Sequence, residues 1–144
     1  MITFIWDHLP LGHNLNSRGA WQKTNKLRQA ILAGVDGPSS ITGRAPASDE
    51  TRYGGLLVVY EPTHGHKDND NLIASCKYYL DYVFKTQDWG RIDKSGHFIP
   101  DDHLVNPYKC YREYRRNEPG FEIHIGTPYE ILMYELRRWR SLYE

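Results

Sequence analysis

The sequence is poor in cysteine, in net charge and in long apolar runs, and each shortage excludes a class of protein. Two cysteines, Cys76 and Cys110, are too few for a disulfide framework and form no CxxC pair, so we expect reduced thiols. No apolar run approaches the roughly 20 residues that a membrane-spanning helix needs. The formal net charge is zero, which argues against a general polycation but permits a local basic surface.

The N-terminal stretch MITFIWDHLP lacks a basic leader and a cleavage-site pattern. We therefore expect no signal peptide, a cytoplasmic location and no membrane partner. The 144 residues, 40% hydrophobic and 25% charged, are typical of one globular domain. The sequence contains no internal repeat and no clear domain boundary, so we expect a single domain over residues 1–144.

The hydrophobic pattern predicts an α+β fold, in which helices pack against a mixed sheet of four or five strands. Strands are expected at residues 2–6, 55–61, 103–116 and 121–126, and the NEPG turn would join the last two as a hairpin. Helices are expected at residues 20–33, 70–85 and 128–144. Thr127 and Pro128 suit the N-cap and the first position of the last helix. Residues 34–53 and 86–100 are expected to be loops.

Potential metal ligands gather in THGHKDNDN, residues 63–71. The first part, with His64 and His66, looks like the opening of the zinc motif T-H-x-H-x-D-H of the metallo-β-lactamase superfamily, since imidazoles and a carboxylate suit zinc. Asn69 stands where that motif has its last histidine, and the chain is short for that family's two-layered fold. The downstream histidines follow in no matching arrangement: His97, His103 and His124. A zinc hydrolase and a merely solvated loop remain alternatives.

The second part of the stretch suits magnesium. Asp68 and Asp70 stand where an apolar strand gives way to a helix, and at such a turn two carboxylates can converge on one cation. Mg²⁺ prefers hard oxygen ligands in octahedral geometry. A third carboxylate is expected from the pair Asp101 and Asp102, about thirty residues further on and just before another predicted strand.

This pattern resembles the RusA-type Holliday junction resolvases. The matching pieces are Lys67-Asp68-Asn69-Asp70-Asn71-Leu72 at the start of a helix, and Asp101-Asp102 before the predicted strands of residues 103–125. The loop with Leu9, Pro10, Asn14, Asn16 and Arg18 is similar to the family's proline-and-asparagine loop. The resemblance covers most of residues 1–126, and residues 127–144 would be an added helix.

The resemblance implies a small homodimeric endonuclease of a type common in phages and prophages. Such enzymes bind four-way DNA junctions in recombination and repair, and nick two opposed strands symmetrically. Asp68, Asp70 and Asp102 would bind Mg²⁺, for which Mn²⁺ can substitute, and Asn71 and Asp101 would support these ligands. DNA contacts are expected from Asn14, Asn16, Arg18 and Lys67, and from the basic cluster Arg112, Arg115 and Arg116.

One departure from the family concerns a catalytic lysine. Ala74 stands where the family has this residue, four positions after the second motif aspartate. Lys77, one turn further along and on the helical stripe of Asp70, is the expected replacement, with Arg91 or Lys94 as alternatives. If none of them replaces it, the chain would be a catalytically weakened junction-binding protein of the same fold.

Overall fold

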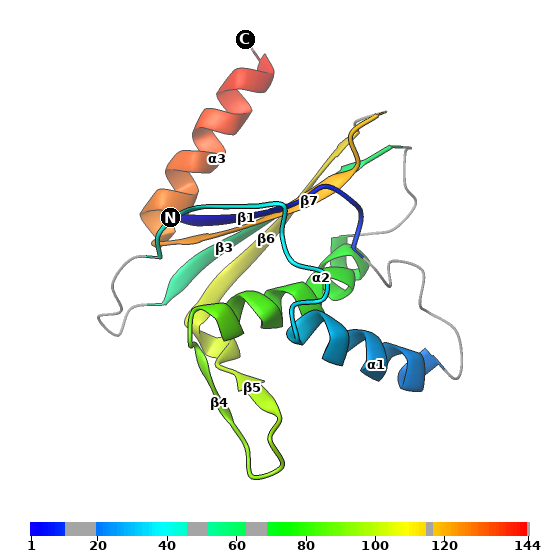
Figure 1. The fold of residues 1–144 in the computed structure, drawn as a ribbon. Helices are drawn as coiled ribbons and strands as arrows, with labels where there is room; N and C mark the ends of the chain where they lie inside the picture. The colour runs from blue at the N-terminus through cyan, green and yellow to red at the C-terminus, as the bar shows by residue number, and fades with distance from the viewer. Residues whose placement is uncertain (11–19, 46–51, 63–68, 115–116, 144) are drawn as a thin grey trace.

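The structure is a computed structural model that describes residues 1–10, 20–45, 52–62, 69–114 and 117–143 (Figure 1). Within these residues, a five-stranded mixed sheet has the strand order β2-β1-β7-β3-β6. Its strands are β1 (Ile2–Trp6), β2 (Ser40–Gly43), β3 (Tyr53–Glu61), β6 (Val105–Tyr114) and β7 (Gly120–Gly126). β3 and β6 are parallel, whereas the other neighbouring pairs are antiparallel. The predicted mixed α+β fold is confirmed.

The α-helices of the described residues cover both faces of this sheet. α1 (Ala20–Leu32) and α2 (Asn69–Thr86) lie against each other on one face, and α3 (Pro128–Tyr143) lies on the other (Figure 1). All nine residues of β3 are buried because the strand faces a helix on each side. Leu57 and Val59 belong to the core beneath α1 and α2, whereas Leu56 and Val58 pack with Ile131 of α3.

Aromatic side chains fix α2 to the sheet. The Trp6 and Phe121 rings are stacked, with their centroids 4.6 Å apart. Tyr79 of α2 meets both rings edge-on, at centroid distances of 5.3 Å from Trp6 and 4.8 Å from Phe121. All three side chains are almost completely buried, so this contact sets where α2 lies on the sheet.

The start of α3 is held by a capping box. The Glu130 backbone N–H donates to Thr127 Oγ1 at 3.1 Å, and the Thr127 N–H donates to Glu130 Oε1 at 3.1 Å. This confirms Thr127 as the N-cap. Gly54 lets the helix approach β3 closely, because a Cβ there would lie 3.0 Å from Ile131 Cγ1 and 3.3 Å from Pro128 Cα.

Three predictions about the connections are wrong. β6 and β7 do not form a hairpin, because β3 lies between them and pairs with both. Residues 86–100 contain a small separate sheet of β4 (Gly90–Ile92) and β5 (Phe98–Pro100). Residues 34–53 contain β2, which pairs with β1. β2 is exposed at all four positions and β4 and β5 have three residues each, so none of them leaves a hydrophobic pattern.

Candidate functional site

The DxDN motif lies where β3 passes into α2. β3 ends at Glu61, which is buried, and α2 begins at Asn69, so Asp70 lies in the first helical turn. Several predicted residues lie outside the described residues: His64, His66, Lys67 and Asp68. The backbones of Asp70 and Asn71 are described, but their side chains are not.

The second acidic element, Asp101-Asp102, lies beside the other end of α2. Asp102 begins the short 3-10 helix η1 (Asp102–Leu104), which leads directly into β6. The Asp101 backbone N–H donates to the Trp89 carbonyl at 3.0 Å. The Trp89 N–H in turn donates to the carbonyl of Phe84, in the last turns of α2. η1 therefore lies at the C-terminal end of α2.

Asp70 thus lies at the N-terminal end of α2, and Asp102 lies beside its C-terminal end. The helix has 18 residues, which at 1.5 Å per residue corresponds to about 27 Å. The strand register agrees, because Val105, next to η1, pairs with Tyr53 at the start of β3, whereas α2 follows the end of β3. Within one subunit, the backbones of Asp70 and Asp102 are therefore too far apart for both carboxylates to bind one metal, and the metal set Asp68, Asp70 and Asp102 stays a prediction. The reason for this distance is that parallel strands begin at the same end of a sheet. β6 therefore begins beside the start of β3 and far from the end of β3, where α2 follows.

Lys77 lies nearer to Asp70 than the alternative cations do. Lys77 follows Asp70 by seven residues, so its Cα lies about 10 Å further along the helix on nearly the same stripe. Lys77 and Ala74 are both exposed. Arg91 and Lys94 belong to the β4–β5 hairpin, beyond the C-terminal end of α2. Lys77 is therefore the cation expected to act with Asp70.

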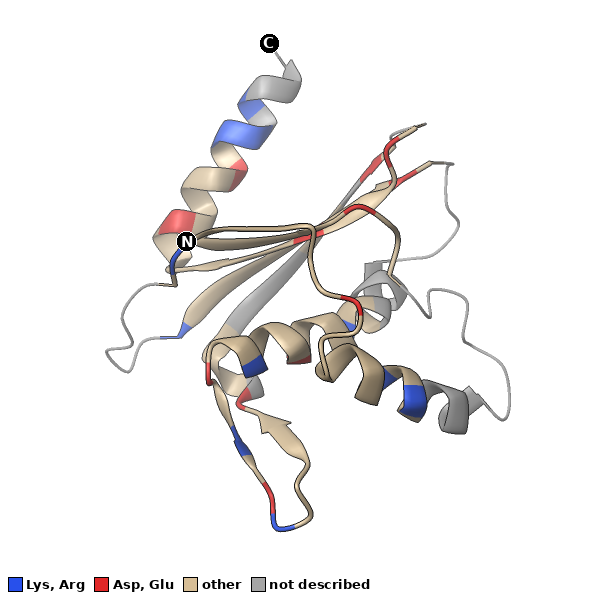
Figure 2. Cartoon of the chain, in the orientation of Figure 1, with Lys and Arg blue, Asp and Glu red and all other residues tan. Residues whose placement is uncertain are grey.

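Basic residues occur along both α1 and α2 (Figure 2). Lys26 of α1 and Lys77 and Lys85 of α2 are exposed. Arg28 forms an ion pair with the buried Asp81, with 3.7 Å between its Nε and Oδ2 of the aspartate. The sequence of α1 contains no acidic residue. The described part of the layer formed by α1 and α2 therefore exposes lysines although the formal net charge of the chain is zero.

Most of the predicted DNA contacts cannot be located. Asn14, Asn16, Arg18, Arg115 and Arg116 lie outside the described residues. Arg112 lies in β6, where only its backbone is described. The prediction that these residues contact DNA therefore stays a prediction.

A polar clasp joins the end of β1 to the α1–α2 layer. His8 Nδ1 lies 2.7 Å from the Leu9 carbonyl, and His8 Nε2 lies 2.9 Å from Asp36 Oδ1. Tyr79 of α2 donates to Asp36 Oδ2 at 2.6 Å, and the Trp6 indole donates to the Asp36 carbonyl at 3.0 Å. Both His8 nitrogens face acceptors, so both can donate only when the ring is protonated.

This clasp predicts a pH dependence of stability. Burial alone would lower the pKa of His8, but the Leu9 carbonyl and the Asp36 carboxylate outweigh it and raise the pKa above 6.5. The clasp therefore stabilises the fold fully below pH 6.5, and this contribution is lost as the pH rises through the raised pKa. The effect should be small, because 37% of the His8 side chain is exposed.

Urea denaturation at pH 6 and pH 8.5 measures this change. The free energy of unfolding should fall between the two values in the wild-type chain, and His8→Gln should remove this part of the decrease. An unchanged pH dependence in His8→Gln would assign the effect to other groups.

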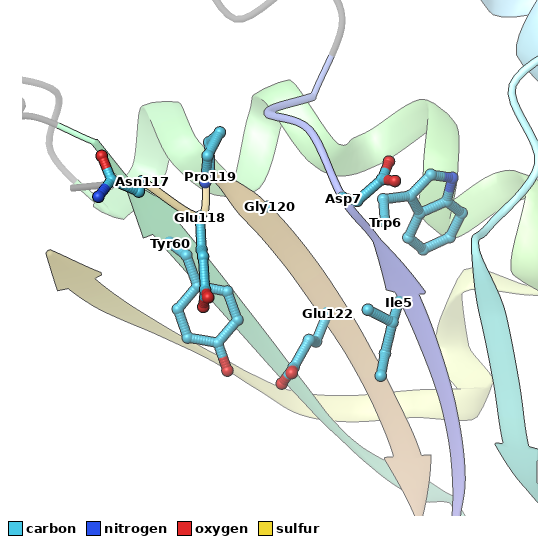
Figure 3. A pocket seen from close by; sticks show the side chains of 9 residues that line it. All are labelled: Ile5, Trp6, Asp7, Tyr60, Asn117, Glu118, Pro119, Gly120 and Glu122. Carbon is cyan, nitrogen blue, oxygen red and sulfur yellow. The ribbon is translucent and has the colours of Figure 1, made fainter. Parts of the chain in front are cut away.

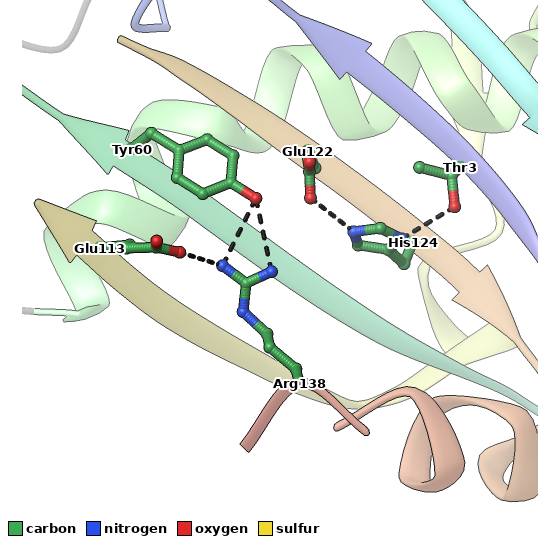
Figure 4. Close-up of polar contacts among 6 residues, drawn as sticks. All are labelled: Thr3, Tyr60, Glu113, Glu122, His124 and Arg138. Carbon is green, nitrogen blue, oxygen red and sulfur yellow. Dashed lines mark hydrogen bonds and ion pairs between the residues drawn. The ribbon is translucent and has the colours of Figure 1, made fainter. Parts of the chain in front are cut away.

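A second polar network anchors α3 to the sheet (Figure 4). Arg138 donates from Nη1 and Nη2 to the Tyr60 hydroxyl, each at 3.4 Å, and pairs with the Glu113 carboxylate of β6. Arg138 is therefore largely buried against the sheet, with 16% of its side chain exposed, and is not part of an exposed basic surface. Burial and the nearby Glu122 raise the pKa of Tyr60 to about 12, so this hydroxyl stays protonated.

The buried His124 extends this network. Its Nδ1 lies 2.8 Å from Thr3 Oγ1 and its Nε2 lies 3.0 Å from Glu122 Oε2. Burial would raise the pKa of Glu122, but His124, Tyr60 and Arg138 hold it below its ordinary value. The sequence analysis missed this network, although the alternation in FEIHIG already places Glu122 and His124 on one face of a strand.

A cavity of about 390 Å³ opens beside this network (Figure 3). Tyr60 and Glu122 form part of its wall, together with the turn before β7 and the end of β1. Its described lining includes the carboxylates of Asp7, Glu118 and Glu122 and contains no lysine or arginine. The described lining of this cavity is therefore acidic.

Comparisons with known proteins leave the family open. No family model, no curated protein and no solved structure matches the chain. Among the described helices, none has the combination of length and apolar content that crossing a membrane requires. The described side chains contain no cluster of three or more histidines, cysteines, aspartates or glutamates suited to a metal, and the three motif aspartates are not among these side chains.

Proposed function

We propose that the protein is a Mg²⁺-dependent, RusA-like endonuclease that resolves four-way DNA junctions by paired symmetric nicks, acting as a homodimer. The observation that carries this proposal is where the two acidic motifs stand in the fold. Asp70 opens the helix that follows the central buried strand, and Asp101-Asp102 stand directly before the strand parallel to it. The described residues form a mixed α+β sheet with helices on both faces, the coarser part of what the resemblance implies.

The donor chemistry suits magnesium, but Asp70 and Asp102 of one subunit lie too far apart to bind one ion. Carboxylate oxygens are the ligands that Mg²⁺ or Mn²⁺ takes in such sites, and Asp68, Asp70 and Asp102 would provide them. When bound, the metal activates water and stabilises charge on the phosphate and on the leaving oxygen. Because α2 separates Asp70 from Asp102, one subunit cannot bring these two carboxylates to the same end of the helix.

We infer that each site is completed by a second subunit. A two-fold axis beside the middle of α2 and perpendicular to the helix brings each end of α2 next to the opposite end of the partner helix. Asp70 of one subunit would then lie near the partner's Asp102, and the dimer would contain two equivalent sites. Two sites related by two-fold symmetry suit a four-way junction, because each of them meets one of the two opposed strands.

The charge distribution indicates which face meets DNA. The exposed lysines of the α1–α2 layer lie on the same face of the sheet as α2, whose first turn contains Asp70. On the other face, the cavity is lined by the carboxylates of Asp7, Glu118 and Glu122. Lys26 and Lys77 are therefore the described side chains expected to contact phosphates, whereas Lys85 donates to the Leu32 carbonyl.

Replacement of the missing family lysine by Lys77 leads to a separate prediction. Lys77→Ala should lower the junction cleavage rate by about 100-fold, because a cation near the developing charge is lost, while junction affinity changes by only a few fold. Lys85→Ala provides the matched control, since Lys85 is exposed on α2 but bonds to the Leu32 carbonyl. The measurement is single-turnover cleavage at saturating protein. Full activity of Lys77→Ala would exclude the replacement.

The function itself is tested with a labelled synthetic four-way junction and a matched linear duplex, incubated with magnesium, with zinc or with EDTA. Paired nicks at symmetric positions, on the junction alone and with magnesium alone, are the expected result. Tight junction binding without cleavage would favour the weakened binding protein, with Ala74 as its cause. Absence of junction binding, together with zinc-dependent hydrolysis of a small ester or amide, would favour the zinc alternative at His64 and His66.

A further inference from the structure

Two thiols that the proposed nuclease site does not use lie on the two sides of the contact between α2 and β6. Cys76 of α2 is 1% exposed and belongs to the core beneath α1 and α2, and Cys110 of β6 packs against the same core. Cys110 pairs in register with Leu57, whose side chain lies in this core. Paired residues of neighbouring strands point to the same face of a sheet, so Cys110 points toward the layer that contains α2.

The two cysteines also lie at the same level along these elements. α2 begins beyond the end of β3 and runs back toward η1, so it is antiparallel to β6. Cys76 follows the start of α2 by seven residues, about 10 Å along the helix. Cys110 precedes the end of β6 by four residues, about 13 Å along the strand. Counted from the other ends, the two positions are about 15 Å and about 17 Å, so both counts place the cysteines opposite each other.

The surroundings of the two thiols differ, and this difference sets the order in which they react. Burial raises the pKa of Cys76 well above its ordinary value, and the nearby Cys110 adds to this effect. The Cys76 thiol therefore stays protonated and is shielded from dissolved oxidants. Cys110 is only partly buried, on a strand at one edge of the described sheet. An oxidant therefore reaches Cys110 first.

We propose that Cys76 and Cys110 form a redox-sensitive pair, which hydrogen peroxide converts to a disulfide between α2 and β6. The Cys110 sulfur attacks one peroxide oxygen, so that a sulfenic acid forms and one water leaves. The Cys76 sulfur then attacks the sulfenic sulfur, the S–S bond forms and a second water leaves. One peroxide is thereby reduced to two waters, while the two thiols lose two hydrogens. The fold favours the second step because it holds both sulfur atoms in one chain.

The bond ties the helix of the proposed nuclease site to the sheet. Cys76 directly precedes Lys77 and follows Asp70 by six residues, so one helix carries the bond and the proposed site. An effect on cleavage therefore rests on the proposed function, whereas the bond itself does not. The disulfide closes a loop between residues 34 positions apart, which should raise the melting temperature by about 5–10 °C. An unchanged melting temperature of the oxidised chain would show that the bond does not restrain α2.

Mass spectrometry of the full chain tests the bond. After treatment with hydrogen peroxide, the monomer should be lighter by two hydrogens, about 2 Da. No thiol should then react with a maleimide after unfolding, and a proteolytic digest should contain one peptide pair that joins α2 to β6. Dithiothreitol should reverse these changes. Two reactive thiols after the treatment, oxygen added at Cys110 without a bond, or a disulfide between two chains would each overturn the proposal.

Two single substitutions are the matched controls. Cys76→Ala removes the second thiol, so the sulfenic acid at Cys110 should accumulate and be trapped by dimedone. Cys110→Ala leaves only the buried thiol, so Cys76 should survive the same treatment. Rapid oxidation of Cys76 in Cys110→Ala would contradict the proposed order of reaction. None of these measurements depends on DNA cleavage or on association of subunits, so their failure is distinct from a failure of the proposed function.

Discussion

Asp70→Asn is expected to lower junction cleavage by about 1,000-fold, equivalent to about 4 kcal/mol of transition-state stabilisation, because a carboxylate ligand of the metal becomes a neutral amide. Junction binding should remain within a few fold of the wild type. The substitution removes a negative charge from the first turn of α2, and the basic residues of the α1–α2 layer are unchanged. Single-turnover cleavage and a gel-shift titration at the same magnesium concentration separate the two effects.

Asp7→Asn is the matched control for this change. Asp7 is exposed after β1 and borders the cavity on the other face of the sheet, so the same loss of charge should leave cleavage near the wild-type rate. Wild-type cleavage by Asp70→Asn would remove this residue from the metal site. An equal loss of cleavage in both variants would point to a general effect of charge.

Phe121→Ala is expected to lower the free energy of unfolding by about 3–5 kcal/mol, the range for large-to-small changes of aromatic residues in a core. The Phe121 ring is completely buried, stacked on Trp6 and in edge contact with Tyr79. Its removal leaves a cavity between the sheet and α2 that the remaining rings cannot fill. The melting temperature should fall by about 10 °C for a chain of this length.

Thermal and urea denaturation measure this effect, with Ile41→Ala as the control. Ile41 lies on β2 and is 52% exposed, so its truncation should change stability by no more than about 0.5 kcal/mol. A loss in Phe121→Ala as small as that in Ile41→Ala would show that the aromatic cluster does not fix α2. Because α2 holds Asp70, we also expect Phe121→Ala to weaken junction cleavage near its melting temperature.

The long elements of the fold follow from their sequence patterns. The apolar run of β3, the helical period of α2 and the Thr127-Pro128 start of α3 each predict the observed element. The short strands do not, because β2 is exposed and β4 and β5 have three residues each. In these segments backbone pairing with a neighbouring strand decides the structure, and side-chain hydrophobicity leaves no signal.

The location of the acidic motifs along the chain is visible in the sequence, but their distance in space is not. Asp102 precedes a strand in either arrangement. Whether it lies near Asp70 depends on whether that strand runs parallel or antiparallel to β3. The NEPG turn favoured a local hairpin of β6 with β7, whereas both strands pair with β3 instead. Both sides of the buried β3 have backbone N–H and C=O groups that need hydrogen-bond partners. This requirement outweighs the preference of the NEPG turn for a local hairpin.

Mixed dimers of Asp70→Asn and Asp102→Asn subunits test the central claim most directly. Each variant alone should be inactive, because both of its sites lack one carboxylate. If each site takes Asp70 from one subunit and Asp102 from the other, a mixed dimer has one site with both substitutions and one intact site. Mixing the two inactive proteins, with time for subunit exchange, should therefore restore magnesium-dependent nicking at one strand of the junction. No recovery, in an experiment where the wild-type chain cleaves and exchange is verified, would contradict a site shared between subunits.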